Sequence, residues 1–142
     1  MILKLETELA VKETADGAKM TTPEEVNARI EDMRDLAQEC FCVLTVNTKN
    51  KLIQRHLVSL GTVNSSLVHA REVFRTAIKD GASSIIVAHN HPSGDPSPSS
   101  QDIQVTKKLI EAGKCIGIDV LDHLIIGEGP ALSLREAGLV AF

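Results

Sequence analysis

The residues whose types and spacing could best do chemistry are two histidines in the run His89-Asn90-His91-Pro92. They follow a short apolar stretch rich in β-branched residues, which predicts a buried strand over 84–91. In a strand, residues i and i+2 point to the same face and lie about 6.6 Å apart. Because a buried ring nitrogen is costly without a partner, this spacing favours two ligands of one metal ion over two structural histidines.

Asp102 is the third candidate ligand. Zinc in hydrolases is typically held by three protein ligands, with the fourth position left to water or substrate. The same residue has a second interpretation, because Ser99-x-x-Asp102 has the form of a helix capping box. The two interpretations are compatible, since a carboxylate in the first turn of a helix points in a fixed direction. Ser99 could be only the cap, or it could donate a hydrogen bond to the oxyanion formed when water attacks a carbonyl.

A hydrolase also needs a base that takes a proton from water. Glu39 is one candidate, because it ends a predicted helix and opens an apolar strand, a junction from which a carboxylate can enter a cleft. Glu72, on the next predicted helix, is the alternative. The pattern alone does not separate them, and a solvated surface position is the commonest one for glutamate.

The sequence gives weaker evidence of a functional role for the other histidines. Asp122-His123 lies inside an apolar run, and we favour a buried structural pair over a support for the metal site. His56 and His69 show no partner at a useful spacing.

The cysteines number three, Cys40, Cys42 and Cys115. An odd count with no second pair at zinc-finger spacing favours reduced thiols and a cytoplasmic location over a disulfide or a Cys-x-Cys metal pair.

Periodicity and turn residues predict the elements that position these groups. A strand is expected over 3–12 and a helix over 22–38, with Val26, Ile30, Met33 and Ala37 as its apolar stripe. A hairpin follows, with strands over 40–46 and 51–58 joined through 47–50. The later elements are a helix over 70–80, the strand over 84–91, a helix over 99–115, a strand over 119–126, and a final segment with Leu132, Leu134 and Leu139 that closes the sheet edge. The predicted fold class is α+β, a mixed sheet flanked by helices in one domain over 1–142.

The composition narrows the functional classes. The chain has 142 residues, a net charge of −4 and only three aromatic residues, all Phe. Such a chain can bury a core as one domain, but it is poorly supplied for stacking on bases or for neutralising many phosphates. It also lacks an apolar run of the roughly 20 residues that span a bilayer, and its start does not have the form of a signal peptide.

The spacing His89-x-His91, seven residues, Ser99, two residues, Asp102 resembles the motif of the JAMM (MPN+) metallopeptidases. The wider sequence resembles the RadC-like branch of that superfamily over roughly residues 22–140. The similarity extends to the run HNHPSGDPSPSSQD, to Thr106, and to the segments Leu121-Asp122-His123, Gly61-Thr62-Val63-Asn64 and Ala70-Arg71-Glu72.

This resemblance implies a single MPN domain with a cytidine-deaminase-like, α/β/α-like architecture. It implies zinc held by His89, His91 and Asp102. Glu39 matches the family glutamate that contacts the metal-bound water, which places it ahead of Glu72, and Ser99 matches the residue that steadies the oxyanion.

The expected function is a zinc-dependent metallopeptidase or isopeptidase-like hydrolase acting on a peptide or isopeptide substrate. The alternative is a DNA-repair-associated accessory or DNA-binding protein with a structural metal. RadC-like proteins commonly carry an N-terminal helix-hairpin-helix region, and only about 20 residues precede the first predicted helix here, which weakens that alternative. The predicted N-terminal strand could pair with a second copy at an exposed sheet edge and form a homodimer; no membrane association is expected.

Overall fold

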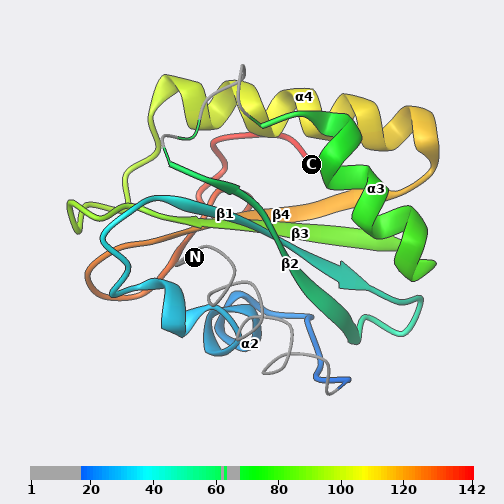
Figure 1. Cartoon of the computed structure of the whole chain (residues 1–142), viewed down its shortest axis with the longest axis horizontal. Coiled ribbons are helices and arrows are strands. Elements are labelled where there is room, and N and C mark those ends of the chain that lie inside the picture. The colour runs from blue at the N-terminus through cyan, green and yellow to red at the C-terminus, as the bar shows by residue number, and fades with distance from the viewer. Residues whose placement is uncertain (1–16, 62, 64–67) are drawn as a thin grey trace.

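The fold is three layers deep, with a β-sheet between two helical layers (Figure 1). The computed structural model describes residues 17–61, 63 and 68–142. In chain order its elements are α2 (Pro23–Ala28), a 3-10 helix (Glu31–Met33), β1 (Cys40–Val46), β2 (Leu52–Leu60), α3 (Ala70–Asp80), β3 (Ser84–Asn90), α4 (Ser100–Ile116), β4 (Asp119–Ile126) and β5 (Leu132–Ser133).

The sheet is mixed, as predicted. Its strand order is β2-β1-β3-β4-β5. Three neighbouring pairs are antiparallel, while β3 and β4 are parallel because α4 crosses between them. A parallel pair needs such a crossover connection, and this one starts directly after the two histidines of the motif.

Alternate residues of the central strands build two separate cores. Phe41, Val43, Ile85 and Val87 belong to the core beneath α3 and α4. Their neighbours in the strands face α2 and the 3-10 helix, since side chains of a strand alternate between its faces. His89 continues the row of Ile85 and Val87, so its imidazole lies on the side of α4.

Most element predictions are confirmed. The helix over 70–80 and the strands over 40–46 and 119–126 have the predicted bounds, and the second hairpin strand and the helix near 99–115 differ from theirs by one or two residues. The strand predicted over 84–91 ends at Asn90, and His91 is the first residue after it. The strand predicted over 3–12, and with it the proposed N-terminal edge pairing, lies outside the described residues.

The helix predicted over 22–38 is wrong in its length. The α-helix ends at Ala28, and a 3-10 turn follows. The Arg29 carbonyl, which would bond the Met33 N–H in an α-helix, instead accepts a hydrogen bond from the Arg55 guanidinium at 2.8 Å, and the Met33 N–H donates to Ile30. The predicted apolar stripe is buried at Val26, Ile30 and Met33, but Ala37 is exposed.

The C-terminal segment closes the sheet edge only in part. Leu132 belongs to β5, which pairs with β4, and Leu134 is buried. Leu139, predicted to belong to the same apolar edge, is 47% exposed. No helix in the described part of the chain is long and apolar enough to cross a membrane.

Candidate metal centre

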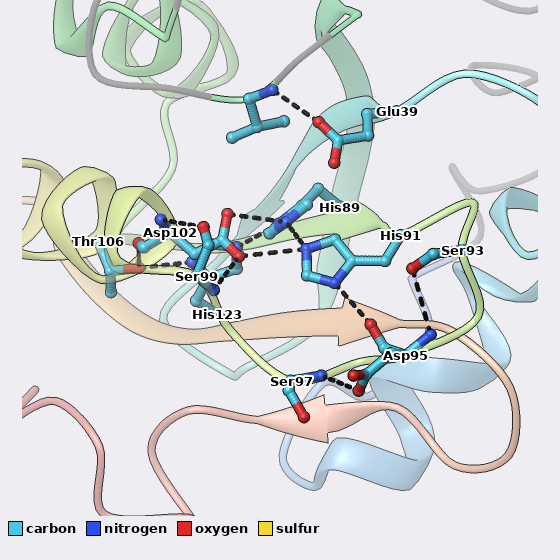
Figure 2. A network of polar contacts seen from close by, with 11 residues as sticks. Glu39, His89, His91, Ser93, Asp95, Ser97, Ser99, Asp102, Thr106 and His123 are labelled. Carbon is cyan, nitrogen blue, oxygen red and sulfur yellow. Dashed lines mark hydrogen bonds and ion pairs between the residues drawn. The ribbon is translucent and has the colours of Figure 1, made fainter.

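Three of the predicted site residues converge at the carboxyl end of β3 (Figure 2). His89 Nε2 lies 2.9 Å from His91 Nε2 and 3.1 Å from Asp102 Oδ1. His91 Nε2 lies 3.1 Å from Asp102 Oδ2. His89 and Asp102 are buried and His91 is partly buried, so little water competes for these atoms.

The size of this triangle suits a zinc ion. Ligand atoms about 2.0–2.1 Å from a tetrahedral zinc are separated from one another by about 3.3 Å, close to the 2.9–3.1 Å found here. Two imidazole nitrogens and a carboxylate oxygen are also ligands that zinc takes in catalytic sites. The residues therefore fit the metal that the family resemblance implies.

The His91 ring is oriented by the loop that follows it. Its Nδ1 lies 2.8 Å from the carbonyl oxygen of Asp95. A carbonyl can only accept, so Nδ1 carries the hydrogen and a neutral His91 presents an Nε2 lone pair to the cluster. Gly127 supports the same loop closely, because a Cβ built on it would lie 2.4 Å from the Gly94 carbonyl oxygen.

Asp102 caps α4, and the same carboxylate faces the two histidines. The Ser99 hydroxyl accepts from the Asp102 N–H, and the Asp102 carboxylate accepts from the Ser99 N–H, which is a complete capping box at the start of α4. The cap aims the carboxylate at the two histidines. Ser99 is exposed and uses a lone pair in the cap, so its O–H hydrogen remains available as a donor.

Glu39 lies just before β1, on the side of the cluster toward β1 (Figure 2). One carboxylate oxygen accepts a hydrogen bond of 2.7 Å from the Val63 N–H. The side chain of Asn90, the residue between the two histidines, brackets Glu39: its Oδ1 accepts from the Cys40 N–H at 2.6 Å, and its Nδ2 donates to the Gln38 carbonyl at 3.0 Å. Sequence reasoning missed this bracket, because only the pairing of β1 with β3 brings the residues together.

Glu72 lies on the exposed surface of α3, where it forms loose ion pairs with Arg71 and Arg75 at 3.8 and 4.0 Å. In the described part of the chain Glu72 makes no hydrogen bond or ion pair with His89, His91 or Asp102, whereas the charge of Glu39 is among the causes that raise the pKa of His91. Of the two glutamates that the sequence pattern left open, Glu39 is the one whose charge acts on the cluster.

His56, which shows no partner at a useful spacing in the sequence, has one far along the chain. Its Nε2 lies 2.6 Å from Asp80 Oδ2, and the Thr45 hydroxyl donates to the same oxygen at 2.6 Å. The partners come from β2, α3 and β1, so no sequence spacing could reveal them. They lie outside the metal cluster.

Asp122 and His123 do not form the side-chain pair that we favoured. Asp122 accepts hydrogen bonds from the Ser133 hydroxyl and from backbone N–H groups of His123 and Arg135, while burial raises its pKa. His123 instead turns its ring toward the cluster, with Nε2 2.8 Å from His89 Nδ1. Burial lowers the pKa of His123 well below its usual value.

The two histidine rings stabilise the charged form of the Asp102 carboxylate. Burial alone would raise the pKa of Asp102, but contacts with His89 and His91 outweigh it and hold that pKa far below its usual range. The hydrogen bond with Asp102 raises the pKa of His91. An ionised carboxylate facing two ring nitrogens is a place where a proton or a metal ion is attracted.

The mixed sheet with helices on both faces is consistent with the JAB/MPN architecture. A family model described as the RadC-like JAB domain matches residues 20–139. The chain therefore belongs to the RadC-like JAB domain family, which confirms the resemblance found in the sequence.

Curated relatives carry the name UPF0758 protein. One from Caldanaerobacter subterraneus is 49% identical over 141 residues, covering 99% of this chain and 60% of the relative. One from Desulforamulus reducens is 50% identical and covers 97% of this chain and 61% of the relative. A third, from Methanosarcina barkeri, is 53% identical over 108 residues, covering 76% of this chain and 47% of the relative. The chain thus spans about half to three fifths of the length of these relatives.

Proposed function

We propose that this chain is a zinc-dependent hydrolase of the peptidase or isopeptidase type. The observation that carries the proposal is the triangle of His89 Nε2, His91 Nε2 and an Asp102 carboxylate oxygen, with sides of 2.9–3.1 Å. Among the described residues three side chains converge as ligands, which leaves the site open, whereas structural zinc sites are normally closed by four. A catalytic role therefore explains the ligand number better than a structural one.

In this proposal His89, His91 and Asp102 hold the zinc ion. When bound, zinc supplies a Lewis acid that polarises a carbonyl and lowers the pKa of a bound water towards 7. Glu39 and Ser99 then supply proton transfer and a hydrogen bond to the oxyanion.

Glu39 accepts the proton of the attacking water and passes it to the leaving amine. Glu39 is half-buried, its carboxylate accepts from the Val63 N–H, and Asn90 holds the peptide groups on either side of it through the Cys40 N–H and the Gln38 carbonyl. A carboxylate held on the side of the cluster toward β1 is a candidate for the general base that the reaction needs (Figure 2). The Ser99 hydroxyl keeps its capping contact through its oxygen, and its hydrogen donates to the oxyanion formed at the substrate carbonyl.

The first experiment is the metal content of protein purified without added metal, measured by elemental mass spectrometry. We expect about one zinc per chain for an open three-ligand site, lost in His89→Ala and in Asp102→Ala while circular dichroism shows that the fold persists. Wild-type protein that stays free of metal after incubation with zinc would overturn the proposal.

The second experiment compares two glutamate variants on a panel of peptide and isopeptide-linked substrates. Glu39→Gln should keep its zinc and lose about 10²–10⁴-fold in rate, the usual contribution of a general base. Glu72→Gln is the matched control and should behave as wild type. Full activity of Glu39→Gln would exclude Glu39 as the base.

The DNA-associated alternative remains a prediction without a structural observation in its favour among the described residues. It would require salt-dependent binding to single-stranded or branched DNA, with a slope that indicates several phosphate contacts. Because relatives are longer than this chain, the same binding assay on the longer relatives would be needed for the whole protein.

A further inference from the structure

A row of buried polar groups begins at His89 Nδ1, on the opposite edge of the ring from the Nε2 that faces the Asp102 carboxylate. His89 Nδ1 lies 2.8 Å from His123 Nε2, and His123 Nδ1 lies 2.6 Å from the Thr106 hydroxyl. The Thr106 hydroxyl in turn lies 2.7 Å from the carbonyl oxygen of Asp102. His89, His123 and Thr106 are completely buried, and they come from β3, β4 and α4 (Figure 2).

The carbonyl at the end of this row determines where its hydrogens lie. Because the Asp102 carbonyl can only accept, the Thr106 hydroxyl donates to it. With the hydroxyl hydrogen reversed, two oxygens would lie 2.7 Å apart with no hydrogen between them. The Thr106 oxygen therefore accepts from His123, whose hydrogen lies on Nδ1.

The position of the hydrogen on the His123 ring then determines its position on the His89 ring. A neutral imidazole carries one N–H, so His123 Nε2 has a lone pair and accepts from His89 Nδ1–H. His89 consequently presents an Nε2 lone pair to His91 and Asp102. The His91 ring reaches the same state separately, through the Asp95 carbonyl.

We propose that Thr106 and His123 are positioning residues that hold His89 as the Nδ1–H tautomer, so that its Nε2 is ready to bind a metal ion. The inference rests on the proposed function only in taking His89 as a metal ligand. It also gives a task to His123, which the sequence pattern assigned to the core. Outer partners of this kind typically change metal affinity 10- to 100-fold when they are removed.

The two residues offer matched substitutions. Thr106→Val removes the hydroxyl at nearly constant volume, so nothing requires His123 to keep its hydrogen on Nδ1. Thr106→Ser keeps the hydroxyl and is the control. At position 123, His123→Leu removes the acceptor for His89 Nδ1–H, whereas His123→Gln offers an amide oxygen that can replace it.

The test needs no substrate, so it is independent of whether the chain is a hydrolase. Long-range nitrogen–proton NMR spectra of metal-free, nitrogen-15-labelled protein report which nitrogen of His89 carries the hydrogen, with the His89 signals assigned from a His89→Gln sample. We expect Nδ1–H in wild type and in Thr106→Ser, and a mixture or Nε2–H in Thr106→Val. Competition with a chromogenic chelator then gives the zinc affinity, which should fall about 10- to 100-fold in Thr106→Val and His123→Leu, and less in Thr106→Ser and His123→Gln.

The outcomes test the positioning of His89 by Thr106 and His123 (the relay) separately from the proposed hydrolase function. An Nε2–H tautomer of wild-type His89, or unchanged zinc affinity in Thr106→Val, would overturn the relay even if the protein hydrolyses peptides. The expected tautomer and affinities would support the relay even if no substrate is found. If the variants unfold, the tautomer of wild-type His89 decides the question alone.

Discussion

The Asp102 carboxylate lies 2.8 Å from the Ser99 backbone nitrogen, and the Ser99 hydroxyl lies 3.1 Å from the Asp102 backbone nitrogen. The carboxylate that completes this reciprocal cap is the same one that faces the two histidine rings. Helix capping and the proposed metal binding therefore depend on one side chain, and the cap determines the direction in which that side chain points.

Single substitutions of Ser99 and Asp102 should have different effects on stability and on zinc binding. Ser99→Ala removes the capping hydroxyl and should lower the free energy of unfolding by about 1 kcal/mol, while zinc remains bound. Asp102→Asn keeps an oxygen that can cap the helix but loses the charge, so zinc should be lost. Urea unfolding and elemental analysis measure the two effects, and loss of zinc from Ser99→Ala would contradict this division.

His91 should make the stability of the metal-free protein depend on pH. Its pKa is raised in the folded state, chiefly by the hydrogen bond with Asp102. A raised folded pKa means that the stabilisation is fully present below the unfolded pKa of about 6.5 and is lost as the pH rises through the folded value. His91→Gln should therefore destabilise the metal-free protein more at about pH 6 than at about pH 9.

Zinc should reverse this dependence, because a protonated histidine cannot bind metal. With zinc present, the wild-type protein should gain stability between about pH 6 and pH 8 through ligand binding to the folded state. Urea unfolding with zinc or with a chelator measures both curves. Parallel curves with and without zinc would contradict the assignment of His91.

Asn90 should be essential for placing Glu39. Replacing it with alanine leaves the Cys40 N–H and the Gln38 carbonyl without their buried partner, at a cost of about 2–3 kcal/mol. We expect Asn90→Ala to bind zinc and to lose hydrolytic rate, because the ligands stay while the base shifts. Gln38→Ala is the control, since only its backbone carbonyl takes part in the bracket; an equal loss in both variants would contradict the argument.

Gly127 should be required for the loop that orients His91. A Cβ at this position would lie 2.4 Å from the Gly94 carbonyl oxygen and 3.1 Å from the Pro96 nitrogen. Gly127→Ala should therefore displace the loop, lower stability by about 1–3 kcal/mol and weaken zinc binding about tenfold through the lost Asp95 contact. Thermal unfolding and chelator competition measure this, with Glu128→Ala as a neighbouring control that adds no atom.

Chain-local geometry explains the parts of the site that could be predicted. The strand that presents His89, the proline-rich loop after it and the capping box at Ser99 all depend on residues a few positions apart. Strand alternation and helix capping act over such distances. The three proposed ligands lie within 14 residues of one another, so their convergence could be anticipated.

The sequence by itself thus determined the order of the described elements, the burial of the central strand and the family. Tertiary structure alone decided which distant groups meet: Asn90 with Cys40, His123 with His89, His56 with Asp80, and Arg55 with the Arg29 carbonyl that ends the first helix. These contacts depend on strand register and on how the helices pack against the sheet. A local pattern does not contain that information, because register is selected by the packing of whole faces rather than by any one pair of residues.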